Sequence, residues 1–275
     1  VGLDLLFVMR FGWGIRGAAV ATVIAQVFSG LGIGLYTWIA EPWLRPKKKE
    51  LSFTKESVGE ILRFSAAACI QQSVMNFGIL MIQGLVNRFG TAVMAAFAAG
   101  VKIDSFAYMP AQEFGNAFSI FTSQNHGAGQ RERVNEGVRC AVKVSMLFCM
   151  LVSMVVFIFA PVLLQLFIDR GETGIIAIGT GYLRVEGAFY CGIGVLFLLY
   201  GYFRGIGKPE MSVVLTVISL GTRVVLAYLT APIPAVGVLG IWWAVPIGWI
   251  LADMAGIWAV WKGEHRTQGN RLHNL

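Results

Sequence analysis

The sequence predicts an all-α integral membrane protein, and three observations support this fold class. Hydrophobic residues make up 56% of the 275 residues and charged residues only 13%, with a mean hydropathy of +0.69 that soluble domains rarely show. Uncharged or nearly uncharged stretches recur at the roughly 20 residues that a helix needs to cross about 30 Å of hydrocarbon. These stretches lack strict polar–apolar alternation, so we expect helices rather than the strands of a barrel.

Seven stretches have the length of a membrane span. They are residues 17–40, 64–87, 91–125, 144–168, 174–203, 211–231 and 236–261, and the apolar segment VGLDLLFVM precedes them. The chain starts at Val1 inside this segment, without an initiator methionine or a cleavage site. We therefore expect it to be the tail of a longer protein.

The first and last stretches share a glycine pattern that indicates an internal repeat. The segment GIRGAAVATVIAQ at 14–26 aligns with GVLGIWWAVPIGW at 237–249. Many multi-pass membrane proteins contain two related bundles. We interpret the first stretch as the last helix of one bundle and residues 41–262 as six helices of a second; ordinary packing of Gly/Ala-rich helices is the alternative.

The segment KKKELSFTKESVGEILRF, which precedes the second stretch, is typical of a linker with an amphipathic helix. Ser57 and Glu60 have the spacing of a capping box, and Val58, Ile61 and Leu62 form an apolar stripe. We expect residues 41–63 to be this linker.

Lysine and arginine are concentrated in alternate connections. Residues 45–56, 131–139, 204–210 and 262–271 are basic, whereas 87–90, 168–172 and 230–237 hold one cation or none. This is the positive-inside pattern, so we expect the basic connections and the C-terminus to be cytoplasmic. The net charge of +7 then reflects topology, and nucleic acid is not an expected partner.

Cysteine and histidine do not form a recognisable site. Cys69, Cys140, Cys149 and Cys191 lie in or beside apolar stretches without CxxC spacing, and His126, His265 and His273 lie outside the stretches. We expect no disulfide framework, metal site, cofactor or catalytic residue.

The third stretch ends in QNHGAG and is followed by a basic segment. A helix that leaves the membrane needs partners for its last carbonyl groups, and Gly127 or Gly129 can adopt the left-handed conformation that supplies them.

Three segments resemble the MATE family, the multidrug and toxic compound extrusion transporters. Residues 89–137 resemble its eighth helix, with an Ala-rich start, a central proline and the QNHGAG turn. Residues 202–210, YFRGIGKPE, resemble the turn after its tenth helix, and residues 12–26 the turn between its fifth and sixth helices. Together the segments place the resemblance over essentially the whole chain.

The resemblance implies a twelve-helix exporter with two six-helix lobes. Residues 1–40 would then be the end of the N-terminal lobe, 41–63 the cytoplasmic linker, 64–262 the C-terminal six-helix lobe and 263–275 a cytoplasmic tail. The implied activity is an antiport, coupled to H⁺ or Na⁺, that exports organic and often cationic drugs or metabolites by alternating access. The implied partners are a small organic substrate, the lipid bilayer of a bacterial inner membrane and the missing N-terminal lobe.

Two features depart from the family pattern. No proline occurs near the start of the seventh helix, and Gln71 and Gln72 stand in a stretch where sodium-coupled members carry an acidic residue. The ion site of those members is therefore not carried over.

Ionisable residues inside the membrane are the main candidates for a functional site, because they are costly there and normally face the bundle interior. Lys102 and Asp104 in one stretch, and Arg184 and Glu186 in another, lie at a similar depth, about 10 to 13 residues from the outer end. Residues two apart on a helix point away from each other. We therefore expect Lys102 to pair with Glu186 and Asp104 with Arg184, with Arg223 on the next helix.

These residues have two possible roles. Asp104 or Glu186 could exchange a proton or sodium ion for substrate, or the network could only stabilise the lobe. In the first case, polar and aromatic contacts to the cavity are expected from Gln71, Gln72, Asn76, Tyr108 and Tyr190. Pro110 is expected to kink its helix, and Glu113 and Asp253 lie nearer the predicted cytoplasmic ends, where they can reach the interface.

Two other functions are compatible with the resemblance or the fold class. One is a flippase of the same superfamily that moves lipid-linked saccharides. The other, more remote, is a membrane-embedded enzyme, which would need a cluster of catalytic groups that the stretches lack.

Overall fold

The computed structural model describes residues 2–42, 45 and 54–272, and every regular element in them is a helix. The predicted all-α fold class is therefore confirmed. The chain divides into two compact units, Val1–Gly59 and Glu60–Leu275.

The first unit contains a short helical segment and one long helix. Helix α1, Gly2–Leu5, continues into the π-helix η1, Leu6–Arg10, and α2 covers Gly14–Ala40. Gly12 and Gly14, with φ angles of 65° and 52°, allow the turn between η1 and α2. Helix α2 is apolar and long enough to cross a membrane.

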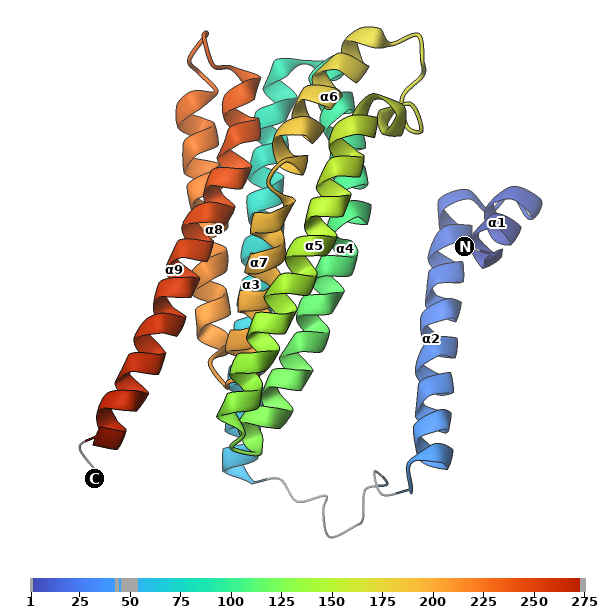
Figure 1. The fold of residues 1–275 in the computed structure, drawn as a ribbon. Coiled ribbons are helices and arrows are strands. Elements are labelled where there is room, and N and C mark those ends of the chain that lie inside the picture. Colours follow the sequence, from blue (N-terminus) through green and yellow to red (C-terminus); the bar gives the residue numbers. More distant parts are fainter. Residues whose placement is uncertain (1, 43–44, 46–53, 273–275) are drawn as a thin grey trace. The chain divides into compact units, whose positions relative to one another are not determined.

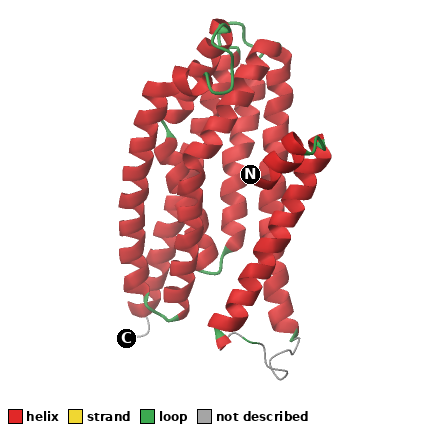
Figure 2. Cartoon of the chain, turned by 90° about the vertical axis from the view of Figure 1, so that its right-hand side faces the viewer, coloured by secondary structure: helices red, strands yellow, loops and turns green. Residues whose placement is uncertain are grey.

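The second unit is a bundle of long helices joined at their ends (Figure 1, Figure 2). Its elements are α3 Lys55–Val86 with the 3-10 turn η3 Asn87–Phe89, α4 Thr91–Gly127, α5 Arg131–Leu164, α6 Thr173–Gly187, α7 Tyr190–Gly205, α8 Pro209–Thr230 and α9 Val238–Leu272. We call the end where α4 meets α5 and α7 meets α8 the basic end, because Arg131, Arg133, Arg204 and Lys208 lie there.

Seven spans were expected, and the described helices supply them. Six helices are long and apolar enough to cross a membrane, and the bent pair of α6 and α7 makes the seventh span. The stretch 174–203 is not the continuous helix that we predicted, because the chain bends by 51° between α6 and α7. Gly187, Gly192 and Gly194 lower the helix propensity around this bend.

Two glycines close the turns at the basic end. Gly129 (φ 72°) ends α4 and Gly207 (φ 76°) ends α7. In each turn the next N–H reaches back five residues, from Gln130 to the carbonyl of Asn125 at 2.9 Å and from Lys208 to that of Phe203 at 2.8 Å. This is the Schellman arrangement. The expected left-handed glycine is thus Gly129, and Gly127 is the last residue of α4.

The linker and its capping box differ from the prediction. Residues 43–44 and 46–53 of the predicted linker lie outside the described residues. The rest does not form a separate helix, because α3 begins at Lys55 and runs without a break into the span. Ser57 is not the cap, since its own N–H donates to Oγ1 of Thr54 at 3.3 Å. At the other end, α9 continues to Leu272, into the segment predicted as a tail.

Glycines bring the helix backbones of the bundle into close contact. A Cβ at Gly201 on α7 would lie 2.3 Å from the carbonyl oxygen of Gly115 on α4, and one at Gly248 on α9 would lie 2.4 Å from that of Ser219 on α8. Small residues allow this approach in membrane bundles, where van der Waals packing replaces the hydrophobic effect between helices. These contacts fix α7 against α4 and α9 against α8.

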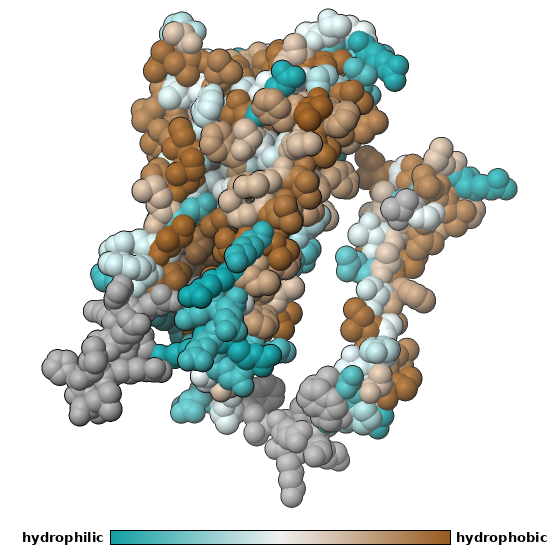
Figure 3. Space-filling view, in the orientation of Figure 1, coloured by the Kyte–Doolittle hydropathy of each residue, from teal (hydrophilic) through white to brown (hydrophobic). Residues whose placement is uncertain are grey.

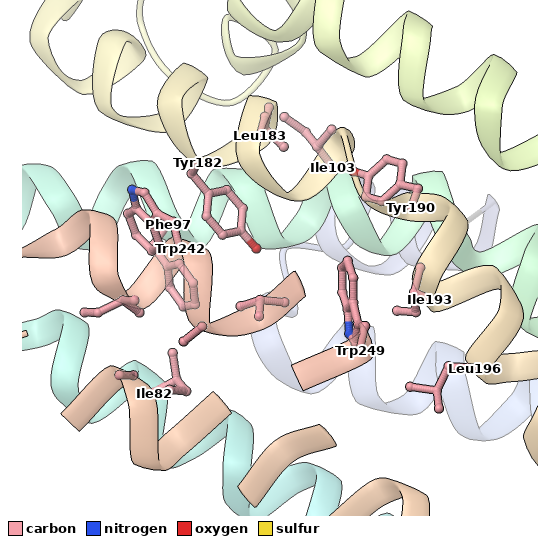
Figure 4. Close-up of a cluster of buried hydrophobic side chains, with 14 of the residues drawn as sticks. Ile82, Phe97, Ile103, Tyr182, Leu183, Tyr190, Ile193, Leu196, Trp242 and Trp249 are labelled. Carbon is pink, nitrogen blue, oxygen red and sulfur yellow. The ribbon is translucent and has the colours of Figure 1, made fainter. Parts of the chain in front are cut away.

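Aromatic rings fill the bundle between α4, α6 and α9 (Figure 4). Phe97 stacks on Trp242 at a centroid distance of 5.6 Å, and Tyr182 meets the Trp242 ring edge-on at 4.8 Å. Tyr182 and Trp242 are both buried. The cluster therefore packs Tyr182, and with it α6, against α4 and α9.

The outer surface of the bundle is largely apolar along its length. Exposed side chains on α5 include Leu147, Leu151, Met154, Ile158 and Val162. Hydrophilic colour gathers at the basic end, whereas brown and pale residues cover most of the rest of the visible face of the bundle (Figure 3). This distribution is that of a multi-pass membrane protein, whose apolar band faces lipid.

Candidate functional site

Two acidic side chains meet inside the bundle. Asp104 on α4 and Glu186 on α6 have exposed fractions of 2% and 3%. Their carboxyl groups are close enough to interact directly. Ionisable residues inside a membrane bundle are rare and usually functional. We therefore take this pair as the centre of the candidate site.

The bend between α6 and α7 supplies the groups around the pair. Glu186 lies in the last turn of α6, and Tyr190 is the first residue of α7. The Tyr190 hydroxyl donates a hydrogen bond to Oδ1 of Asp104. The second Asp104 oxygen, Oδ2, and Oε1 of Glu186 are buried without a hydrogen-bond partner among the described residues.

Arg223 on α8 is the cation that faces this pair. It interacts electrostatically with both Asp104 and Glu186. Its side chain is half-buried, and its Nε has no hydrogen-bond partner within the described part of the chain. One guanidinium therefore faces two carboxyl groups.

The predicted pairing of Lys102 with Glu186 and of Asp104 with Arg184 is wrong. Lys102 and Arg184 are exposed. The guanidinium of Arg184 lies over the ring of Phe157 on α5, 5.5 Å from its centroid. Two residues along a helix rotate a side chain by about 200°, so the inward direction of both acids turns both cations outward. The acids pair with each other and with Arg223 instead.

The other predicted site residues are spread over the bundle. Tyr108, half-buried on α4, lies 6.0 Å from the ring of Phe197 and interacts electrostatically with Asp104. Pro110 lies inside α4, which continues through it. Gln72 and Asn76 lie on the exposed side of α3, where the Gln72 amide donates to Oδ1 of Asn76 at 3.3 Å. Of these four residues, Tyr108 is the one that interacts with the acidic pair in the described part of the chain.

Gln71 lies in a different place, nearer the basic end. It lines a pocket of about 290 Å³ together with Ser65, Arg204 and Pro209. Nη2 of Arg204 donates to Oδ1 of Asn116 at 3.1 Å, which ties α7 to α4 beside this pocket.

Sequence reasoning missed two groups. Tyr182 is fully buried and interacts with both Asp104 and Glu186. Tyr182 lies four residues before Glu186, so the two side chains share one face of the helix, and this spacing could have predicted that Tyr182 joins the site. Asp253 was expected to reach the interface, but it is buried on α9 with an exposed fraction of 9%.

The residues of the site do not form a metal cluster. Among the described residues, no group of three or more His, Cys, Asp or Glu side chains is arranged to hold a metal ion. The chemistry of the site is that of two carboxyl groups, two tyrosine hydroxyls and one guanidinium.

A helical bundle with an apolar exterior and buried charged groups is typical of multi-pass membrane proteins of the transporter class. Comparison with known proteins identifies the family. The chain belongs to the MatE family, whose sequence pattern matches residues 67–229. The resemblance noted from the sequence is therefore confirmed.

Two curated relatives match most of this chain. The probable multidrug resistance protein NorM of Thermotoga maritima is 28% identical over 237 residues, covering 85% of this chain and 50% of the relative. The probable multidrug resistance protein YpnP of Bacillus subtilis is 32% identical over 217 residues, covering 78% of this chain and 47% of the relative. The chain thus spans about half the length of the curated relatives it matches.

A solved structure shows the same fold. The crystal structure of MATE in complex with MaL6 superposes with a TM-score of 0.90 and 22% sequence identity, and the match covers 97% of this chain and 61% of that one. At this identity the similarity establishes the architecture.

Proposed function

We propose that this chain is the second lobe of an ion-coupled antiporter that exports organic, often cationic, compounds by alternating access. It acts with a first lobe in the inner membrane of a bacterium, and its basic end faces the cytoplasm. Asp104 and Glu186 bind the coupling ion, which is H⁺ or Na⁺.

The charge balance of the buried cluster carries this proposal. Asp104 and Glu186 together contribute two negative charges when ionised, whereas Arg223 contributes one positive charge. In a medium of low dielectric, an uncompensated charge is strongly disfavoured. One further monovalent cation makes the cluster neutral. Binding and release of that cation therefore change the stability of the conformation in which the cluster is sealed.

The bend in the fourth span of the bundle, between α6 and α7, allows this change in charge to move the helices. Glu186 and Tyr190 lie on either side of the bend, so an altered charge at the pair acts on both α6 and α7. Discontinuous helices commonly build ion sites in transporters, because their ends leave backbone groups unpaired near the middle of the membrane. Movement of α6 against α7 would then link ion occupancy to opening of the lobe.

The alternative functions have less support. The two curated relatives compared above are probable multidrug resistance proteins, which favours drug export over a lipid-linked saccharide flippase. Relatives of this family are transporters, which also disfavours the membrane-embedded enzyme.

The proposal is tested with the complete transporter in sealed vesicles loaded with a fluorescent organic cation. Imposing a proton gradient or a sodium gradient should accelerate release of the dye, and the gradient that does so identifies the ion. Vesicles without protein provide the control for leakage. Release at the same rate with and without both gradients would refute ion coupling.

A further inference from the structure

A third buried carboxyl group lies in the bundle, apart from the pair. Asp253 is on α9, and its Oδ2 points toward the first turn of α7, where a Cβ added at Gly192 would lie 3.6 Å away. Its Oδ1 is buried without a hydrogen-bond partner among the described residues. This is an ordinary van der Waals distance, so the carboxyl group packs against α7 at Gly192.

The groups around Asp253 do not neutralise it. On α7, Tyr200 is the titratable group that interacts with it. On α8, the Arg223 side chain lies beside Gly248 of α9, which is five residues before Asp253. The Arg223 guanidinium, however, interacts with Asp104 and Glu186. On α6, Glu186 and Tyr182 likewise face Asp104. The surroundings of Asp253 thus offer a tyrosine and apolar side chains, with no ion-pair partner in the described part of the bundle.

A carboxyl group in such a place cannot stay ionised and empty without a large loss of free energy. It is stable when it carries a proton or when it coordinates a small monovalent cation. In both cases one positive charge neutralises the Asp253 carboxylate. The position is also close to the N-terminal end of α7, which begins at the bend next to the acidic pair.

We propose that Asp253 is a second site for a proton or sodium ion, located between the acidic pair and the basic end. This inference rests on the proposed function only in identifying the bound cation with the coupling ion. Occupancy of Asp253 alternates with that of the pair, so that the cation leaves the pair toward the basic end by way of α9.

A line of buried polar groups continues from Asp253 toward the basic end. Tyr200 interacts with Thr216 on α8, whose hydroxyl donates to the carbonyl of Ser212 at 2.8 Å. The Ser212 hydroxyl donates to the carbonyl of Tyr200 at 3.3 Å. Nε of Arg204, one turn further along α7, donates to the same carbonyl at 3.2 Å. These groups offer oxygen atoms that can coordinate a sodium ion, and hydrogen-bonding partners for a proton carried by water, in an otherwise apolar bundle.

Infrared difference spectroscopy on the purified complete transporter tests the proposal, because it reports the protonation of individual carboxyl groups. One arm steps the pH from acidic to alkaline without sodium, and the other adds sodium at constant pH. The matched variants are Asp253→Asn, which removes the carboxyl group, and Asp253→Glu, which keeps it. Glu186→Gln provides the control for the pair.

A protonated-carboxyl band should disappear in the pH step, be absent from Asp253→Asn, be shifted in Asp253→Glu and persist in Glu186→Gln. Loss of the same band on adding sodium would show that sodium displaces the proton. If the spectra of Asp253→Asn match those of the unaltered protein in both arms, Asp253 binds no exchangeable cation and the proposal is overturned. The outcome does not depend on whether Glu186 couples transport, which is measured separately by gradient-driven efflux.

Discussion

At the residue scale, the central feature is the imbalance between two carboxyl groups and one guanidinium. Asp104, Glu186 and Arg223 come from three different helices, so their charges bear on how α4, α6 and α8 pack. Removing one carboxyl group leaves one negative charge, which the Arg223 guanidinium balances. Removing both leaves the guanidinium without a counter-charge.

Thermal stability should follow this balance. Asp104→Asn or Glu186→Gln alone should leave the melting temperature nearly unchanged at neutral pH. The double variant should lose up to about 3 kcal/mol, since Arg223 is only half-buried, which corresponds to roughly 10 °C. Adding Arg223→Gln to the double variant should restore most of the loss. Unfolding in detergent measures all four proteins, and equal stability of the double variant and the parent would show that Arg223 does not depend on the acids.

At the scale of the elements, glycine determines where helices approach and where they bend. Gly201 brings α7 against the carbonyl of Gly115, and glycines surround the bend that separates Glu186 from Tyr190. Close backbone contact fixes α7 at its basic end, while the bend leaves its other end free to follow α6.

A pair of alanine substitutions tests the role of glycine in close helix contact. Gly201→Ala should destabilise the bundle by about 1–3 kcal/mol, because the new methyl group would overlap the Gly115 carbonyl. Gly221→Ala on α8 is the matched control. No atom lies within 4 Å of its added Cβ, so it should be neutral or stabilise by about 0.5–1 kcal/mol through helix propensity. Melting temperatures in detergent compare the two, and an equal effect would contradict the close packing of α4 and α7.

The sequence was sufficient to predict the helices but not their facing partners. Apolar length located the spans, and the QNHGAG turn reduced the left-handed glycine to Gly127 or Gly129, because both depend on local composition. The depth of Asp104 and Glu186 was also predictable from their distance along the helices. Their pairing was not, because helix rotation is set by packing contacts such as Gly100 against Tyr182. The burial of Asp253 likewise depends on how α9 packs against α7, which the sequence does not give.

At the scale of the whole molecule, the second unit is a membrane bundle with an apolar exterior and an apolar core that encloses a few buried polar groups. The acidic pair lies at the bend of one span, and Asp253 is a further buried carboxyl group on α9. In the proposed antiporter, the ion acts on the pair, while the substrate is bound together with the first lobe. Ion coupling and substrate exchange are therefore separable activities.

The most direct test of ion binding by the pair compares these two activities in vesicles that contain the complete transporter. Glu186→Gln and Asp104→Asn should each exchange labelled for unlabelled substrate across the membrane without a gradient, because the remaining acid and Arg223 are balanced. Neither variant should accelerate substrate release when the proton or sodium gradient that drives the parent protein is imposed. If both variants respond to that gradient as the parent does, the acidic pair is not the coupling site.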